Sequence, residues 1–217
     1  MRMAGILLII SLSAVPCAGM EISRVTRCTG DVLKVRGDIQ AGDYVKFRSY
    51  FGDQRRIAGL DLNSPGGALD EGFRIAALTR QKRLSTFVSK ECDSACAFIF
   101  LVGKKRYASK EAKIGVHAVG NDYGNEDSGT IRDTIWFARL FAKFGIPSST
   151  IGKMVTTPPS KITFLDQTDL SALKIIFRDP FKAGVGAHNC IDRESVEASA
   201  TGGTLLGRVE TSERPDR

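Results

Sequence analysis

A serine and a histidine at the ends of apolar segments could together carry out acyl-transfer chemistry. Ser94 lies in the sequence CDSAC, residues 92–96, directly before an apolar stretch, and the small side chain of Ala95 leaves room for a substrate carbonyl. His117 lies in the apolar segment 113–118 and is one of 2 histidines in the chain. Because a serine hydroxyl is a weak nucleophile until a base takes its proton, the two residues are candidates for a nucleophile and its base. A helix cap and a buried structural histidine are the simpler alternatives.

A glycine-rich turn is a candidate for the third part of such a site. The sequence NSPGG, residues 63–67, follows an apolar strand pattern and precedes a helical one. Backbone N–H groups at a helix N-terminus have no partner within the helix and attract anions, so this turn could hold an oxyanion. A turn that uses its glycines only for backbone geometry is the alternative.

The segments around these residues predict an α/β fold. Apolar or alternating runs predict strands at residues 31–37, 57–62, 86–89 and 113–118. Helical spacing predicts a helix at 68–80, and the almost wholly apolar segment 95–102 is predicted as a buried helix. This alternation is typical of a layered α/β domain in which helices flank a mostly parallel sheet.

Two further helices are predicted in the second half of the chain. One covers residues 130–144 and is stopped by Gly145 and Pro147, and the other is a short helix, 167–174, that Asp166 could cap. The apolar residues of 130–144 cover more than one stripe of a helix. We expect either a partner subunit on the second surface or burial between two layers of the same chain.

The N-terminal residues predict export. Arg2 precedes an apolar block at 6–15, and small residues follow at 17–19, which is the build of a secretory signal peptide. The block is too short to span a bilayer. We expect cleavage after residue 19, which leaves one domain at 20–193 and a polar, flexible tail at 194–217. The predicted location is the periplasm or the medium.

The cysteines agree with an oxidising compartment. Beyond the predicted signal peptide, the chain contains Cys28, Cys92, Cys96 and Cys190. An even number of cysteines suits an exported protein, and we expect at least one disulfide. The sequence leaves all three pairings of four cysteines open.

Composition excludes several classes of function. The chain has 217 residues, 42% of them hydrophobic, and a net charge of +7. It can bury a sizeable core, but its basic residues are scattered, which argues against a nucleic-acid partner. With 2 histidines and no second cysteine pair, we expect no metal site and no cofactor.

Together these motifs resemble the Clp protease proteolytic subunit and its ClpP/crotonase-like relatives. Ser94 follows Gly67 by 27 residues and precedes His117 by 23, as in that family. The matching positions, in order, are NSPGG (63–67), Gly72, DSA (93–95), Gly103, Arg106 and VH (116–117). The resemblance runs from about Val32 to Ile176 and is greatest to exported, single-domain bacterial proteins of this type. It implies the ClpP-type α/β fold.

The resemblance also implies a serine peptidase. Ser94 would be the nucleophile, His117 the general base and then the general acid, and the N–H groups of Gly67 and Ala95 the oxyanion hole. Peptides or unfolded proteins would be the substrate, and a homo-oligomer is possible. We expect no ATP-driven unfoldase as a partner of an exported protein.

One catalytic position departs from the family. The family's aspartate falls on Ile162, two residues before Phe164, and neither Ser160 nor Asp166 occupies that position. His117 would then act through a serine, a backbone carbonyl or water, with a large loss of rate. A serine–lysine pair is a variant, and its conceivable bases are Lys90, Lys104, Lys105 and Lys161.

Two other functions remain open on the sequence. The missing acid, and two cysteines that bracket Ser94, favour a catalytically weak or inactive protein of the same fold that serves in binding or assembly. A crotonase-like enzyme acting on thioesters is the third alternative, but acyl-coenzyme A is cytoplasmic, which disfavours it for an exported chain.

Overall fold

A single mixed sheet organises the molecule. The computed structural model describes residues 19–27, 30–121, 123–182 and 193–195. Its nine-stranded sheet has the order β7-β6-β4-β3-β2-β1-β9, with β5 between β4 and β8 off this path. The strands are β1 (Glu21–Thr26), β2 (Asp31–Arg36), β3 (Ile57–Ser64), β4 (Ser85–Asp93), β5 (Arg106–Ala108), β6 (Lys113–Val116), β7 (Thr163–Phe164), β8 (Ile176–Phe177) and β9 (Arg193–Ser195).

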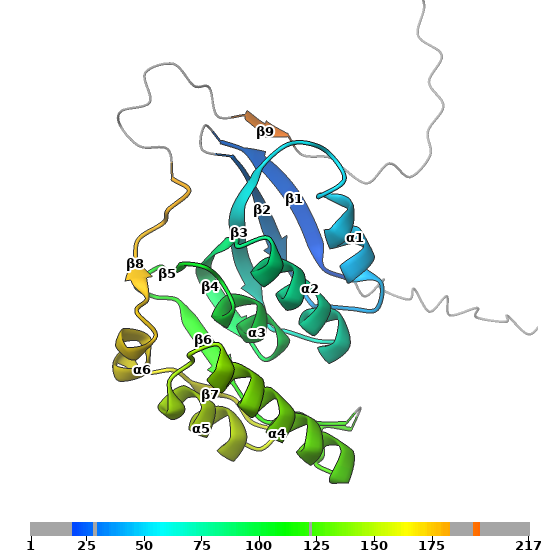
Figure 1. Cartoon of the computed structure of the whole chain (residues 1–217), viewed down its shortest axis with the longest axis vertical. Coiled ribbons are helices and arrows are strands. Elements are labelled where there is room, and N and C mark those ends of the chain that lie inside the picture. Colours follow the sequence, from blue (N-terminus) through cyan, green and yellow to red (C-terminus); the bar gives the residue numbers. More distant parts are fainter. Residues whose placement is uncertain (1–18, 28–29, 122, 183–192, 196–217) are drawn as a thin grey trace, which may run out of the picture.

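Six helices accompany the sheet in this part of the chain. They are α1 (Asp43–Ser49), α2 (Leu69–Gln81), α3 (Ala95–Leu101), α4 (Ser128–Lys143), α5 (Ser148–Thr156) and α6 (Gln167–Ala172). In Figure 1, α1, α2 and α3 lie along one face of the central strands, and α4 and α5 lie together near β6 and β7.

The central strands are parallel, as the sequence predicts. The strands β2, β3 and β4 pair in parallel, so that Leu33 lies opposite Leu60 and Leu60 opposite Thr86. The strand β4 pairs with two different strands on this side: its first half pairs with β5, and its last three residues pair with β6. The end of β4, which leads to Ser94, therefore lies beside β6, and His117 directly follows β6. The predicted α/β class is confirmed.

The helices α2 and α3 pack at van der Waals distance because small residues face one another. A Cβ on Gly72 would lie 2.7 Å from the Cβ of Ala95, so glycine is required for this approach. Every side chain of α3 is buried, which confirms the predicted buried helix at residues 95–102. Strand-to-helix turns before α2 and α3 therefore come side by side.

The helix α4 buries one face only. Its buried residues are Thr130, Thr134, Phe137 and Phe141. Ile131, Ile135 and Trp136 are 48%, 43% and 47% exposed. Burial of α4 between two layers of the same chain is therefore wrong for the described residues, and its second apolar surface is open.

Residues 1–18 of the predicted signal peptide and most of the predicted tail fall outside the described residues. Two residues of that tail, Glu194 and Ser195, belong to β9, which pairs with β1. Within the described ranges no helix is long and apolar enough to cross a membrane.

Candidate active site

Ser94 occupies a sharp turn between β4 and α3. Its φ of 54° and ψ of −123° lie outside the regions that non-glycine residues prefer, and such backbone strain is concentrated at functional sites. The Ser94 N–H donates to the carbonyl of Gly115 on β6, at 3.0 Å, which fixes the turn to the neighbouring strand. A serine on a strained strand-to-helix turn presents its hydroxyl away from the sheet, as nucleophiles on such turns do.

A disulfide closes the same turn. Cys92 and Cys96 are bonded, with their Cα atoms 5.1 Å apart, and both side chains are fully buried. The bond therefore joins the end of β4 to the first turn of α3, on either side of Ser94. It confirms the expectation of at least one disulfide, whereas Cys28 and Cys190 lie outside the described residues.

The glycine turn of residues 63–67 touches the serine turn. A Cβ on Gly66 would lie 2.6 Å from the carbonyl oxygen of Asp93 and 2.8 Å from the Cβ of Ser94, so only glycine permits this approach. Gly66 and Gly67 both have positive φ, 100° and 133°. The N–H of Gly67 has no hydrogen-bond partner among the described residues, whereas the flanking Ala68 N–H bonds to the carbonyl of Ile39.

His117 is held in one tautomer by the backbone. Its Nδ1 lies 2.7 Å from the carbonyl oxygen of Ala118, and because a carbonyl only accepts, Nδ1 carries the proton and Nε2 has the free lone pair. Two buried bonds fix the segment after the histidine: the Ala118 N–H donates to the carbonyl of Thr157 at 2.8 Å, and the Val119 N–H to the hydroxyl of Thr134 at 2.9 Å. The helices α4 and α5 thus position the imidazole.

One pocket brings the predicted residues together. Gly67, Ser94 and His117 all line a cavity of about 140 Å³. Its other walls are largely apolar and come from Leu69, Phe98, Ala118, Val119, Gly120, Asn121, Gly124 and Pro159. Ala95, the second predicted oxyanion donor, is the first residue of α3 and directly follows Ser94. No lysine lines the pocket, so none of the four lysines proposed as a base for Ser94 lies at it.

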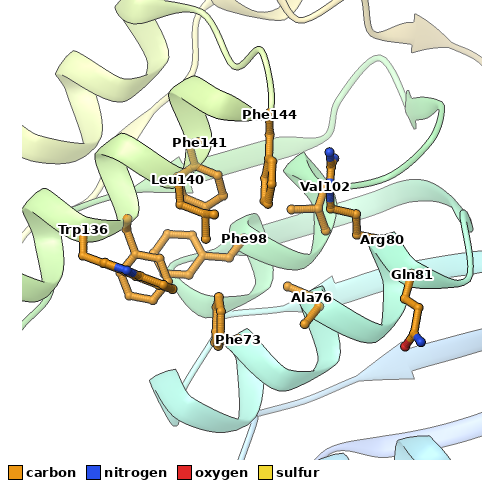
Figure 2. A pocket seen from close by; sticks show the side chains of 12 residues that line it. Phe73, Ala76, Arg80, Gln81, Phe98, Val102, Trp136, Leu140, Phe141 and Phe144 are labelled. Atoms are coloured by element: carbon orange, nitrogen blue, oxygen red, sulfur yellow. The ribbon is translucent and has the colours of Figure 1, made fainter.

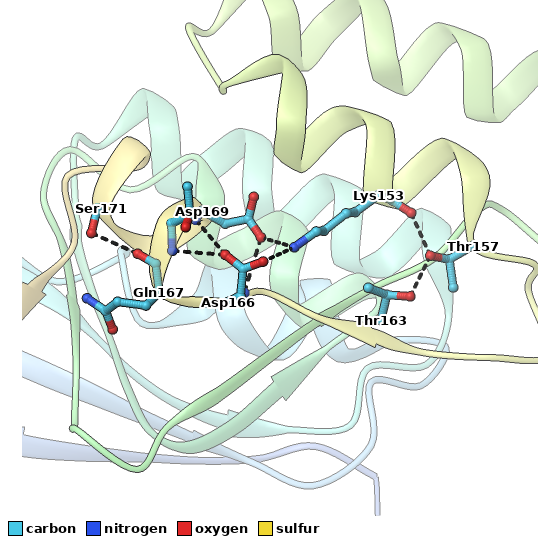
Figure 3. Close-up of polar contacts among 8 residues, drawn as sticks. Lys153, Thr157, Thr163, Asp166, Gln167, Asp169 and Ser171 are labelled. Atoms are coloured by element: carbon cyan, nitrogen blue, oxygen red, sulfur yellow. Dashed lines mark hydrogen bonds and ion pairs between the residues drawn. The ribbon is translucent and has the colours of Figure 1, made fainter.

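Asp166, the acidic residue considered for the third position, is engaged elsewhere. Asp166 accepts the N–H groups of Thr168 and Asp169 at the start of α6, which confirms the predicted cap. Its carboxylate also pairs with Lys153 at 2.6 Å, and Lys153 bonds the buried Asp169 as well (Figure 3). This network lowers the pKa of Asp166, chiefly through Lys153.

Asp93 is a buried carboxyl, and nothing in the sequence indicated its burial. A Cβ built on Gly115 would overlap both the Asp93 carboxyl and the side chain of Ile162, so these two residues meet over the same glycine. Burial, followed by the neighbouring Glu91, raises the pKa of Asp93 to about 7. Ile162 thus occupies the position at which the resemblance expects an acid, and the Asp93 carboxyl of β4 lies beside it across Gly115 of β6.

Two features of the site had no usable signal in the sequence. Any residue supplies a carbonyl, so nothing marked Ala118 as the partner of the imidazole. The burial of Asp93 depends on the register of β4 against β6, which the sequence does not specify. Among the described residues, no cluster of three or more histidine, cysteine or acidic side chains could hold a metal ion.

Comparison with known proteins finds solved structures with a similar fold. No family model and no curated protein matches the chain. ClpP1 from Listeria monocytogenes superposes with a TM-score of 0.54 at 18% identity, over 68% of this chain and 92% of that one. A point mutant of the same ClpP1 gives 0.52 at 20% identity, over 68% and 91%.

A second kind of protease shares the fold. A point mutant of 1510-N, a membrane-bound stomatin-specific protease, superposes with a TM-score of 0.51 at 16% identity, over 68% of this chain and 78% of that one. The chain therefore has a fold like that of ClpP.

Proposed function

We propose that this protein is an exported serine hydrolase that cleaves peptides or unfolded protein segments. The observation that carries the proposal is the meeting of Ser94, on a strained turn, and His117, in the tautomer of a base, at one pocket. A general base with a free lone pair beside a serine hydroxyl is the arrangement that activates such a nucleophile.

In the proposed reaction, Ser94 Oγ attacks the peptide carbonyl carbon while His117 Nε2 takes its proton. The N–H groups of Gly67 and Ala95 bind the oxyanion, because Gly67 lies in the turn before α2 and Ala95 begins α3, and helix N-termini favour negative charge. His117 then gives its proton to the leaving amine, and a water molecule releases the acyl group from Ser94. The Ala118 carbonyl takes the orienting role of the missing aspartate, but it carries no full charge, so we expect slower turnover than a complete triad supports.

Export is part of the proposal. The buried disulfide between Cys92 and Cys96 supports it, because disulfides persist in oxidising compartments and are rare in the cytosol. We also propose that no ATP-driven partner delivers the substrate.

Labelling with a fluorophosphonate probe tests the proposal. We expect the purified protein, kept oxidised, to be labelled on Ser94, as located by mass spectrometry, and Ser94→Ala and His117→Ala each to abolish the label. Ser160→Ala is the matched control, because Ser160 is exposed and directly follows the pocket residue Pro159. A folded protein that takes no label between about pH 6 and 9 would contradict the proposal and favour a binding or assembly protein.

A further inference from the structure

An apolar groove lies between α2 and α4. Ser94 and His117 do not line it, although Phe98 lines both this groove and the serine pocket. Aromatic rings bridge the two helices, so that Phe73 lies 5.2 Å from Trp136 and 5.6 Å from Phe137, centroid to centroid. The floor is buried and consists of Ala76, Phe98, Val102, Phe137 and Phe141. The space between is about 360 Å³, within the range of small-molecule pockets.

Figure 2 shows how the groove ends. Phe144 of the α4 C-terminus and Arg80 of α2 close one end, with the guanidinium carbon 3.7 Å from the centre of the phenyl ring. Arg80, Val102 and Phe144 also line a second hollow, which is polar and holds Arg83 and Lys104. The two spaces therefore adjoin at these three side chains: an apolar trough lies beside a cationic hollow, which we call the mouth.

Three cations at the mouth have no acidic partner. Arg80, Arg83 and Lys104 form no ion pair within the described residues, and no aspartate or glutamate lines either space. The fourth cation, Arg106, is engaged by the fold, because its guanidinium donates to the carbonyls of Leu101 and Leu173. Backbone bonds hold the mouth together, since the Arg83 N–H donates to the carbonyl of Arg80 and the Lys104 N–H to that of Leu84.

We propose that this groove binds a fatty acid anion. The alkyl chain lies against the aromatic floor, and the carboxylate meets Arg80, Arg83 and Lys104. The apolar walls supply affinity in proportion to the chain length buried, and the cations select for a negative head group. The trough has one cationic mouth and a volume suited to a single chain, which favours a fatty acid over a diacyl lipid.

Trp136 makes the proposal directly measurable, because it lines the groove and is the single tryptophan of the chain. We expect dodecanoate, titrated below its micelle concentration, to change Trp136 emission saturably. Dodecanol, which has the same chain and no charge, should bind about tenfold more weakly, since about 1.4 kcal/mol of lost charge interaction is tenfold in affinity. Equal affinity for the two ligands would overturn the proposal.

Variants locate the site. Arg83→Glu combined with Lys104→Glu should weaken dodecanoate binding about tenfold or more and leave dodecanol unaffected. Lys105→Glu is the matched control, because it reverses the next charge along the chain but lines neither space. Ala77→Phe should block both ligands, since Ala77 is exposed at the groove and a phenyl ring there fills it.

The remaining outcomes overturn the proposal. If Ala77→Phe leaves dodecanoate binding intact, the ligand lies elsewhere. If dodecanoate fails to bind and Ala77→Phe instead dissociates a dimer in sedimentation, the groove is covered by a second copy of the chain. Fluorophosphonate labelling of Ser94 is a separate readout, so failure of this proposal leaves the hydrolase proposal standing.

Discussion

Asp93 makes the folded protein bind a proton that the unfolded chain releases. Burial, followed by Glu91, raises its pKa from 3.8 to about 7. Because the folded value lies above the unfolded one, the associated stability is complete below the unfolded pKa and is lost as the pH rises through about 7. We expect Asp93→Asn to remove this loss, so that the variant gains stability relative to the wild type, by up to a few kcal/mol, between about pH 4 and pH 8.

Thermal unfolding of both proteins over this pH range measures the effect. The quantity to follow is the difference between the two curves. Asp53, Asp127 and Asp166 have lowered pKa values, so their contribution to stability is lost as the pH falls, and it cancels in that difference. Asp133→Asn serves as the control, since its carboxylate is 51% exposed. Parallel curves for wild type and Asp93→Asn would show that Asp93 does not hold the proton.

The meeting of Asp93 and Ile162 over Gly115 makes a second prediction at this scale. Ile162→Asp alone should not speed fluorophosphonate labelling, because it places a second carboxylate against the first, and like charges at close range hold one another protonated. In an Asp93→Asn background the same change supplies an unopposed acid near His117, and we expect labelling to rise about tenfold over Asp93→Asn alone.

The rate of probe incorporation at a fixed pH measures this, with Ile162→Asn in the same background as the uncharged control. If Ile162→Asn accelerates labelling as much as Ile162→Asp, polarity rather than charge is responsible. If neither does, the Ala118 carbonyl already orients the imidazole as well as a carboxylate would.

At the scale of single elements, the disulfide between Cys92 and Cys96 stabilises the turn that carries Ser94. It joins β4 to α3 across Ser94, whose φ of 54° is unfavourable for a side chain. We expect Cys92→Ala with Cys96→Ala to lower the free energy of unfolding by about 2 kcal/mol, the value expected for so short a loop. The rate of Ser94 labelling should also fall in the fraction of the double variant that remains folded, because the turn that carries Ser94 relaxes without the bond.

Labelling rate and unfolding free energy, taken on the same preparation, separate these effects. Cys92→Ala alone is the informative companion, since it removes the bond while Cys96 keeps its volume. Unchanged labelling in a folded double variant would show that β4, Gly66 and Gly115 hold the turn without the bond.

The elements next to the site were predictable from sequence, as were the outer helices α4 and α6, whereas several other outer elements were not. Patterns of short apolar strands and of the helix after Gly67 gave β2, β3, α2, α3 and β6 with small errors at their ends, because these segments are buried and their periodicity is strong. The strand β1 and the helices α1 and α5 were missed, since their patterns are short and their burial depends on partners distant in sequence.

The same division holds for the site. Residue types made Ser94, His117 and Gly67 candidates, the resemblance to the ClpP family predicted that they form one site, and the structure places all three at one pocket. The pairing of Cys92 with Cys96 was one of three open alternatives. The split pairing of β4 between β5 and β6, which buries Asp93, follows from the sheet as a whole and leaves no local pattern.

At the scale of the whole molecule, the outer face of α4 is the surface that the fold leaves uncovered. Ile131, Ile135 and Trp136 line a shallow hollow there with Arg132 and Arg139, and contiguous exposed apolar side chains mark interaction sites. We expect the protein to self-associate through this face, so that its sedimentation mass rises with concentration. Ile135→Glu should reduce the mass toward that of one chain, because a charge buried in an apolar contact is costly.

Val45→Glu is the matched control for this experiment. Val45 is 70% exposed on α1 and is absent from the α4 hollow, so replacing it removes an exposed apolar side chain without touching that face. Equal masses for the two variants, or a single-chain mass for the wild type at every concentration, would show that α4 is not the contact. Because Ile135 does not line the aromatic groove, fatty acid binding should survive Ile135→Glu, which separates self-association from ligand binding at the level of one side chain.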